Sequence, residues 1–543
     1  MTRTSTRTSL TGTTALLRLA LRRDRVLLPV WIVVLALVAM SSASATAGLY
    51  PTVASRRAIA ETSNATPSLV AMYGPVYDPT SLGAVSMLKL TVFGALAVAI
   101  LMILLVVRHT RAEEEAGRLE LLRAGVLGRH ASLAAALLLV TGASLVLGLL
   151  TALGLVSAGL GLAGSVALGA VWALTGMTFA CVAAVTAQLV EGARAANGAA
   201  VVVLVAAYFL RALGDTAVQP VTGEPGVLSW VSPLGWAQQI RPYAGNRWAL
   251  VLLPVALSGL LIVVAWALES RRDVGAGLVR PRLGRERAAY SLGSPLGLAW
   301  RLQRTTLAWW LVGYLVLGAV VGSIVTNLDG MLDSPAARRM VQRLGGTANL
   351  TDAFLATELG ILAVVASAYA ISASLRLRSE ETSQRAEVVL ATATSRWRWM
   401  ASHVLVALLG GGLLMVAAGL GAGVAAGSAT GDVSGQLGSV LGAALARVPA
   451  VWVLTAVAVA LFGLRPRAVA TAWAVLAGCL LAGEFGELLG LPTGVRELSP
   501  FRQVSALPGS AFSAGPLVVL VLVAAALVLV GFVAFRRRDL TAG

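Results

Sequence analysis

The sequence predicts an all-α integral membrane protein of about twelve membrane-spanning helices, arranged as two parallel six-helix repeats within one chain. Three observations support this prediction: the hydropathy of the chain, the distribution of its charges, and an internal repeat of charged motifs. Of the 543 residues, 57% are hydrophobic and 12% are charged, whereas soluble domains carry roughly 25% charged residues. The mean hydropathy of +0.83 has the same implication, so most of the chain is expected to lie within a membrane.

The apolar stretches define the predicted spans, since a helix that crosses the hydrocarbon core needs about 20 mainly apolar residues. They lie at 26–48, 90–107, 131–157, 164–190, 199–214, 249–268, 306–326, 359–375, 400–424, 448–464, 467–483 and 516–535. The first stretch also fits a signal peptide, because arginines precede it and Ala43-Ser44-Ala45 resembles a cleavage site. A retained helix is preferred, because a similar segment with arginine and tryptophan recurs in mid-chain, at 301–310.

The basic residues set the expected orientation, because cytoplasmic loops carry the excess of arginine and lysine. With the N-terminus inside, the predicted cytoplasmic segments hold 30 basic and 13 acidic residues, which accounts for the whole net charge of +17. Both termini are therefore expected in the cytoplasm, with the chain crossing a bacterial plasma membrane many times. In a soluble chain this charge would suggest a nucleic-acid partner. Here it reflects topology, and no nucleic acid is expected.

A repeated charged segment divides the chain into halves. The segments after the second and the eighth predicted spans align at a constant offset of 267 residues. The identical pairs are Arg111/Arg378, Glu113/Glu380, Glu114/Glu381, Arg118/Arg385, Glu120/Glu387, Ala124/Ala391 and Arg129/Arg396. Six spans in each half make the repeats parallel. The predicted domains are residues 1–268 and 297–543, joined by a linker at 269–296 that is rich in Arg, Gly and Pro.

We call residues 111–123 the first acidic segment and residues 378–390 the second acidic segment. Each is predicted as one short helix, in which a glutamate precedes an arginine by four residues, the favourable order for a helical ion pair. One face of this helix would hold Glu113, Gly117 and Glu120 in the first segment and Glu380, Gln384 and Glu387 in the second. Such charges fit a solvated helix end or a docking surface. Their recurrence in both halves favours docking of a partner that comes in pairs.

The pattern R-x-E-E-x-x-G-R-x-E-x-L, after two spans and an amphipathic Arg-rich segment, resembles the type-2 membrane subunits of ATP-binding cassette (ABC) exporters. It is similar in particular to the fused twelve-span actinobacterial permeases of polyketide antibiotics, the tetronasin type. The resemblance covers nearly the whole chain and implies a type-2 exporter permease fold, pseudo-dimeric in one chain. It also implies that each acidic segment is a coupling helix that contacts an ATPase. This role falls on Glu113, Glu114, Arg118, Glu120, Glu380, Glu381, Arg385 and Glu387. Gln384 replaces the glycine of the pattern, so the two contacts need not be equivalent.

The nucleotide site is expected on another subunit. A P-loop requires a Gly-Lys-Ser/Thr sequence, because its lysine reaches the phosphates and its hydroxyl binds magnesium. The one lysine, Lys89, stands between leucines. We therefore expect two copies of a separate ATPase to bind ATP and Mg²⁺, and we expect this chain to be no enzyme and to bind no cofactor. Cys181 and Cys479 lie in apolar runs, and the three histidines are scattered, so no metal site is expected either.

Three further features are predicted from local sequence. Residues 12–25, and their counterpart near 297–304, fit a helix lying in the inner membrane interface or an ordinary positive anchor. Proline and aromatic residues before the last span of each half fit an aromatic belt or a short re-entrant helix that closes the outer end. These possible gate residues are Trp230, Ser232, Pro233, Ser499, Pro500 and Phe501. Arg211 and Asp215, four residues apart, fit an intramembrane ion pair or interfacial anchors.

These features favour the permease subunit of an ATP-driven exporter that moves hydrophobic or amphiphilic compounds, such as antibiotics, polyketides and other drugs, out of the cell. The spans are rich in Leu, Val, Ala and Gly, which suits such a cargo and contact with membrane lipid better than ions or sugars. The alternative is a proton-coupled secondary multidrug transporter. That mechanism requires an acidic residue within the membrane to bind the proton.

Overall fold

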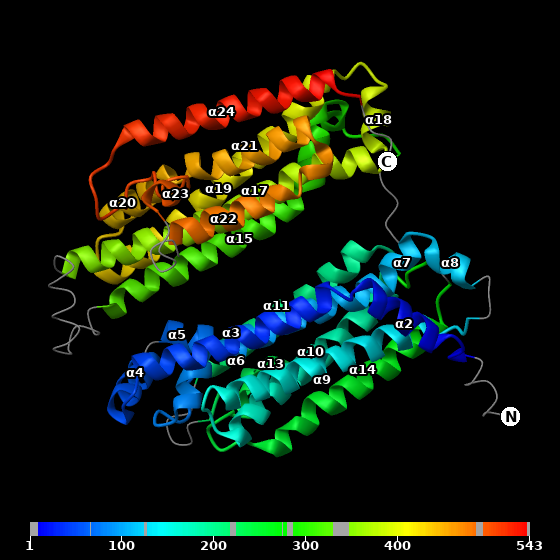
Figure 1. Cartoon of the computed structure of the whole chain (residues 1–543), viewed down its shortest axis with the longest axis vertical. Helices are drawn as coiled ribbons and strands as arrows, with labels where there is room; N and C mark the ends of the chain where they lie inside the picture. The colour runs from blue at the N-terminus through cyan, green and yellow to red at the C-terminus, as the bar shows by residue number, and fades with distance from the viewer. Residues whose placement is uncertain are drawn as a thin grey trace. The chain divides into compact units, whose positions relative to one another are not determined.

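The computed structural model describes residues 9–65, 67–123, 127–217, 224–273, 275–279, 286–328, 347–484 and 492–539. Within these ranges the regular structure is helical and includes no strand, so the predicted all-α class is confirmed. The chain forms two compact units, Met1–Gly284 and Arg285–Gly543, each of which is a bundle of long helices (Figure 1).

The first unit contains six long apolar helices, with short helices at both ends of the bundle. The long helices are α3 (Leu27–Leu49), α6 (Leu82–His109), α9 (Ala131–Ser157), α10 (Leu162–Leu189), α11 (Ala193–Thr216) and α14 (Leu252–Ser270). The short ones are α2 (Thr13–Arg23), α4 (Val53–Ala65), α5 (Pro67–Tyr73), α7 (Arg111–Glu115), α8 (Arg118–Arg123), α12 (Val227–Val231), α13 (Pro233–Gln239) and the 3₁₀ helix η1 (Trp248–Val251). Helices α7 and α8 lie at one end of this unit, and α4 and α5 lie at the other (Figure 1).

Helix α10 is the centre of the first unit and packs against α6, α9, α11 and α14. Small residues allow this close packing: a Cβ on Gly169 would lie 2.3 Å from the carbonyl oxygen of Gly148 on α9. The indole of Trp172 lies directly against Gly94 of α6, and its Nε1 donates to the carbonyl of Leu90 at 3.1 Å. The largest buried side chain of the unit is thus accommodated by a glycine.

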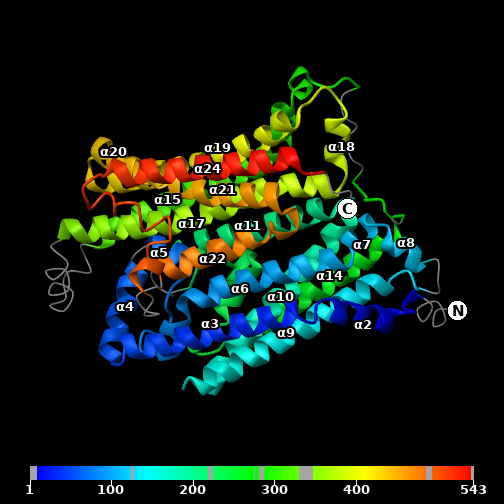
Figure 2. The same ribbon diagram turned by 45° about the horizontal axis from the view of Figure 1, so that its top comes forward.

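The second unit is likewise a bundle of helices, whose main members are 14 to 36 residues long. They are α15 (Pro295–Leu328), α17 (Thr347–Thr382), α19 (Arg396–Thr430), α20 (Val433–Ala446), α21 (Val448–Leu464), α22 (Thr471–Glu484) and α24 (Ala514–Arg537). Shorter elements are α18 (Arg385–Leu390), α23 (Thr493–Arg496), and the 3₁₀ helices η2 (Tyr290–Gly293) and η4 (Pro466–Ala468). The last helix, α24, runs alongside α21 (Figure 2).

Small residues also bring α15 and α19 together in the second unit. A Cβ on Gly318 would lie 2.2 Å from the carbonyl oxygen of Ala418, and a Cβ on Gly322 would lie 2.2 Å from that of Ala422. A Cβ on Gly421 of α19 would likewise lie 2.2 Å from the carbonyl oxygen of Leu315. Because lipid tails are as apolar as leucine, such close backbone packing is a main source of helix association in membranes.

Eleven helices in the described ranges are long and apolar enough to cross a membrane, against the twelve predicted. The difference lies at the predicted span 467–483, where α22 has 14 residues and its apolar part, Thr471–Leu480, is shorter than a span. Before it, α20 and α21 form a nearly continuous apolar stretch, Val433–Leu464.

The predicted interfacial helices differ between the units. In the first unit, a turn at residues 24–26 separates α2 from α3. In the second, α15 runs from Pro295 to Leu328 without a break, so residues 297–304 form the first turns of a longer helix. The turn in the first unit contains Asp24, whose carboxylate is held by α6; Gln303 stands at the corresponding place in α15.

Candidate functional site

Each acidic segment consists of two helices joined by a residue in the left-handed conformation. In the first segment, Gly117 has a φ of +68° between α7 and α8; in the second, Gln384 has a φ of +59° between α17 and α18. The prediction of one continuous helix is therefore wrong at the same position in both copies. A positive φ ends the preceding helix and redirects the chain, so the three residues predicted to share a face lie on different helices.

Glu114 is a buried residue of the first segment that is bound by two arginines. Arg272, which follows the last long helix α14, donates from Nη1 and Nη2 to the two carboxylate oxygens of Glu114 at 2.8 and 2.6 Å. Arg111 donates to the same carboxylate from one turn earlier in α7. The Nε of Arg272 donates to the side-chain oxygen of Gln188 on α10 at 2.6 Å. This bidentate geometry is the strong form of an arginine–carboxylate pair.

Glu381 is bound in the same way in the second unit. Arg538, directly after the last helix α24, donates to its two carboxylate oxygens at 2.6 and 2.9 Å. Arg378 lies 3.7 Å from the same carboxylate. The guanidinium of Arg538 also lies over the rings of Phe462 and Phe535, 5.0 Å from each centroid. We call the pairs Glu114–Arg272 and Glu381–Arg538 the two Glu–Arg clamps.

A second pair of contacts attaches the chain that follows each acidic segment to the same last helix. Nη2 of Arg129 donates to the carbonyl oxygens of Glu269, Ser270 and Arg272 at 3.0, 2.8 and 3.0 Å. Nη1 of Arg396 donates to those of Arg536 and Arg538 at 3.4 and 2.8 Å. Arginine at a helix C-terminus satisfies the last carbonyls and complements their partial negative charge. Each acidic segment is thus held on both sides to the end of the last helix of its unit.

The exposed residues of the segments present both charges. Glu113 lies 3.7 Å from Arg118, and Glu380 lies 3.9 Å from Arg385. Exposed members are Glu115, Arg118 and Glu120 in the first segment, and Gln384, Arg385, Glu387 and Val388 in the second. Glu114, Glu380 and Glu381 are 8%, 7% and 3% exposed, so the direct ATPase contact that the resemblance implies for these three glutamates does not fit their burial.

The first acidic segment and the nearby turn after α2 form additional polar contacts with neighbouring helices. Glu113 forms an ion pair with Arg23 at the end of α2. The buried carboxylate of Asp24 lies 3.2 Å from Arg108 and 2.5 Å from His109 at the end of α6. Glu115 accepts a hydrogen bond from the backbone N–H of Ala193, the first residue of α11, at 2.9 Å.

The second segment is surrounded differently. Glu380 forms its ion pair with Arg376 of its own helix, at 2.8 Å. Gln303 of α15 lies 3.4 Å from the ring nitrogen of His403. Trp399 packs between His403 and Phe535, with ring centroids 5.6 Å from each. Aromatic packing thus occupies the place that ion pairs have in the first unit.

The predicted outer gate residues form ordered helices in the first unit. Ser232 caps α13: its Oγ accepts from the N–H groups of Leu234 and Gly235 at 3.2 and 3.3 Å and donates to the carbonyl of Ala207 at 2.6 Å. Pro233 is the first residue of α13, a position that proline favours. The carbonyl of Trp230, on α12, accepts from the indole of Trp236 at 2.5 Å.

The corresponding outer residues of the second unit form turns. Ser499 and Pro500 are buried, and Phe501 packs partly buried against three hydrophobic clusters. The Oγ of Ser499 has no hydrogen-bond partner among the residues that the structure describes. The short helix nearby, α23, ends at Arg496 and precedes these residues.

Arg211 and Asp215 form an ion pair within α11, with Nη1 and Oδ2 3.2 Å apart and both side chains fully buried. Arg211 also donates to the carbonyl of Ala71 in α5 at 2.6 Å. Asp215 accepts from the hydroxyl of Ser229 in α12 at 2.8 Å. The pair therefore joins three elements at the end of the unit opposite the acidic segment.

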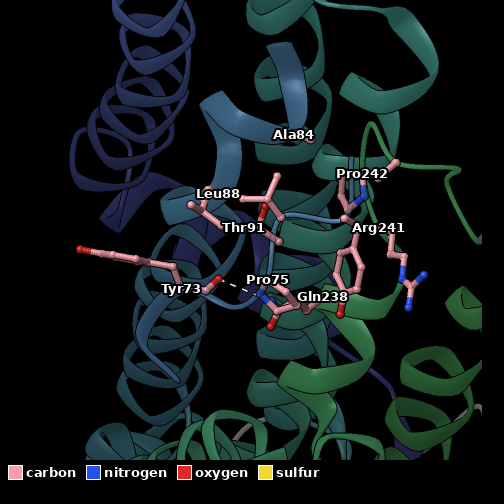
Figure 3. Close-up of a pocket in the computed structure, with 11 residues that line it drawn as sticks. Tyr73, Pro75, Ala84, Leu88, Thr91, Gln238, Arg241 and Pro242 are labelled. Atoms are coloured by element: carbon pink, nitrogen blue, oxygen red, sulfur yellow. Dashed lines mark hydrogen bonds between the residues drawn. The ribbon is translucent and has the colours of Figure 1, made fainter. Parts of the chain in front are cut away.

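A cavity of about 30 Å³ lies at this same end (Figure 3). The guanidinium of Arg241 lies over the Tyr77 ring, 3.9 Å from its centroid, and Gln238 donates to the carbonyl of Tyr73 at 3.4 Å. The volume is about that of one water molecule, so this cavity is too small for a drug. Nearby, the hydrogen bond from Arg247 lowers the pKa of Glu224 below its usual value, which keeps the carboxylate ionised.

Neither free cysteine is placed for metal binding or disulfide chemistry: Cys181 is buried and Cys479 is half-buried. Across the described part of the chain, no group of three or more His, Cys, Asp or Glu side chains is arranged to hold a metal ion.

Comparison with known proteins gives two matches. The family model for the C-terminal domain of the multidrug efflux system permease Rv1217c matches residues 292–536, which lie within the second unit. The chain is also 46% identical over 531 residues to the multidrug efflux system permease protein Rv1217c of Mycobacterium tuberculosis (strain ATCC 25618 / H37Rv). This alignment covers 97% of the chain and 95% of the relative. Both matches support a multidrug efflux permease. Neither supports the tetronasin-type specificity that the sequence resemblance suggested.

Proposed function

This chain belongs to the family of the multidrug efflux system permease Rv1217c, and from that premise we propose that it is the membrane permease subunit of an ATP-driven (ABC) exporter. Its cargo is hydrophobic or amphiphilic compounds, with antibiotics, polyketides and other drugs as the candidate class. Two copies of a separate ATPase bind ATP and Mg²⁺ and dock on the two acidic segments. The chain lies in the bacterial plasma membrane with both termini in the cytoplasm.

The recurrence of the Glu–Arg clamp in both units is the observation that carries this proposal. Removing one partner of a buried ion pair costs about 3–5 kcal/mol, because the other charge is left buried without compensation. A segment attached in this way moves together with the last helix of its unit. A partner that displaces the exposed face of the segment therefore also displaces that helix.

The mechanism that follows needs only small movements at the segments. Closure of the ATPase pair on ATP shifts the exposed residues around Glu120 and Glu387. The clamps and the capping arginines, Arg129 and Arg396, transmit this shift to α14 and α24. The two six-helix halves then change from an inward-open to an outward-open arrangement, which requires that ATP-bound ATPase bind the second arrangement more tightly.

The rival mechanism, proton-coupled transport, needs an acidic residue that gains and loses a proton within the membrane. The most deeply buried acid of the first unit, Asp215, has an arginine and a hydroxyl as partners. Through these contacts the pair links α11 to α5 and α12. This is a structural role, whereas a proton carrier needs a carboxylate that exchanges its proton with both sides of the membrane.

The test uses charge reversal at the exposed glutamates rather than at the buried ones. The full chain is reconstituted in proteoliposomes with its ATPase, for which a P-loop protein encoded beside it is the first candidate. We expect Glu120→Arg combined with Glu387→Arg to lower chain-stimulated ATP hydrolysis at least about tenfold, or about 1.4 kcal/mol, without lowering the melting temperature. Glu286→Arg, at an exposed position at the start of the second unit, is the matched control and should change nothing.

Unchanged stimulation in the double variant would refute the docking surface. Efflux that persists after inactivation of the ATPase, and stops when the proton gradient is collapsed, would favour the rival. The two single variants also show whether the docking sites are equivalent: equal losses indicate equal contacts, and unequal losses identify the dominant one.

A further inference from the structure

The second unit has an apolar groove of about 470 Å³ where the start of α15, the first turns of α19 and the last turns of α24 meet. Its volume lies within the range of about 300–1,000 Å³ that is typical of small-molecule sites. Leu296 and Leu405 on its walls are 44% and 43% exposed, so the groove is open at the surface of this unit. Val528 and Phe532 of α24 form the opposite wall.

The charged side chain in the lining of the groove is that of Arg398. Two serines line it, but their hydroxyls are engaged within the chain: Ser402 donates to the carbonyl of Trp399 at 2.7 Å, and Ser294 donates to that of Ser291 at 3.3 Å. Arg398 is exposed, and no acidic side chain of the described ranges forms an ion pair with it. A guanidinium in this situation is suited to a phosphate, to which it can donate two parallel hydrogen bonds.

Basic residues predominate at the adjoining end of α24. Arg536 and Arg537 are exposed at the end of α24, whereas Arg538 is already bound by Glu381. Basic clusters beside a membrane-spanning helix attract anionic lipid head groups. The electrostatic field at the groove therefore favours a negatively charged ligand.

The dimensions of the groove match one leaflet of a bilayer. Arg398 and Leu408 are ten residues apart on α19, which corresponds to about 15 Å at a rise of about 1.5 Å per residue. This is half of the hydrocarbon thickness of about 30 Å. Both α19 and α24 are candidate membrane spans, and Arg398 lies in the first turn of α19. Its guanidinium thus lies at the polar boundary, with the apolar walls extending inward from it.

We propose that this groove binds one anionic glycerophospholipid from the inner leaflet. The phosphate accepts hydrogen bonds from Arg398, and one acyl chain lies along Leu405, Leu408 and Phe532. In the first unit, the position aligned with Arg398 is Ala131, which is buried. The aligned position of the first unit therefore lacks the guanidinium that the proposed site requires.

The experiment is native mass spectrometry of the full chain in detergent, titrated with phosphatidylglycerol or with phosphatidylcholine of the same acyl chains. We expect one phosphatidylglycerol to bind at least about tenfold more tightly than phosphatidylcholine. Arg398→Ala should lower phosphatidylglycerol affinity about tenfold, the change expected for loss of a charge-assisted hydrogen bond. It should lower phosphatidylcholine affinity less, because the choline cation offsets the charge of the phosphate that both lipids share. Leu405→Trp, which fills the groove, should weaken both lipids.

The control is Arg22→Ala, an exposed arginine of α2 in the first unit, which should bind both lipids as the wild type does. Equal affinity for the two lipids would overturn the proposal, as would phosphatidylglycerol binding that is unchanged in Arg398→Ala or equally reduced in Arg22→Ala. If Arg398→Ala folds poorly, Arg398→Lys keeps the charge without the bidentate geometry, and an affinity equal to the wild type would overturn the proposal. The readout involves no ATP, so its outcome is independent of the proposed transport function.

Discussion

The two acidic segments share their attachments but differ in their surroundings. Both have a buried glutamate bound by an arginine that follows the last helix, and both have an arginine capping that helix. Around the first clamp, polar groups such as Gln188 and Arg111 complete the site. Around the second, Arg538 lies against two phenylalanine rings. The common part is therefore the connection between segment and helix, and the rest of each site has diverged.

The Glu–Arg clamp is thus present in both units although the residues around it differ. A guanidinium allows this because it has both hydrogen-bond donors and a flat face. Its donors satisfy the carboxylate, and its face packs on aromatic rings. The first clamp therefore depends on hydrogen-bond geometry and the second also on packing. Variants at aligned positions can separate these contributions.

The largest effect is expected from removing the clamp arginines. Arg272→Ala and Arg538→Ala should each lower the free energy of unfolding by about 3–5 kcal/mol, because each removes the bidentate arginine partner of a buried carboxylate. Denaturant unfolding in detergent measures both losses.

The controls for the clamp variants are the exposed neighbours Arg271→Ala and Arg537→Ala, for which we expect changes within about 0.5 kcal/mol. Adding Glu114→Gln to Arg272→Ala should restore part of the stability, because the buried charge is removed with its partner. Losses no greater than those of the neighbours would contradict the clamp as a stabilising contact.

A smaller effect is expected at the left-handed residue that interrupts each segment. Gly117→Gln should cost about 1–2 kcal/mol, because residues with a Cβ disfavour this conformation; no atom lies within 4 Å of the new Cβ, so the cost is confined to the backbone. Gln384→Gly should gain less than about 1 kcal/mol, since glycine loses more conformational freedom on folding. Hydrogen exchange of the amides in α8 and α18 measures both changes.

Gly117→Asn provides the matched comparison for this position, because asparagine tolerates positive φ better than glutamine does. It should lose less protection than Gly117→Gln. The same loss in both variants would indicate that the side chain, and not the backbone conformation, is responsible.

The sequence was informative about helices and much less about contacts. Hydropathy alone predicted α9 and α21 with the bounds that the structure has, because apolar runs end where charged or turn residues begin. The break at Gly117 was missed because helical periodicity carries no information on the sign of φ. In the first copy, glycine is a residue type that often adopts positive φ. In the second copy, Gln384 gives no such indication of the break.

The clamps were not predicted because their partners are far apart in the chain. Arg272 follows Glu114 by 158 residues, and no local pattern connects them. Moreover, Arg272 and Arg538 are 266 residues apart, one fewer than the offset of the glutamates, so a search at constant offset does not pair them. The sequence feature that could have indicated the clamps is an arginine shortly after the last span of each half.

The smallest effect is expected at the predicted gate residues of the two units, where Ser232 and Ser499 are aligned. Ser232→Ala should cost about 1 kcal/mol, the usual cost of removing an N-cap, because its hydroxyl accepts from α13 and donates to the carbonyl of Ala207. Ser499→Ala should change stability by no more than about 0.5 kcal/mol, because the described residues offer its hydroxyl no partner. Thermal unfolding of the two variants compares them directly. Equal losses would show that the two outer ends are held alike, and the contrast between the units would then be confined to their acidic segments.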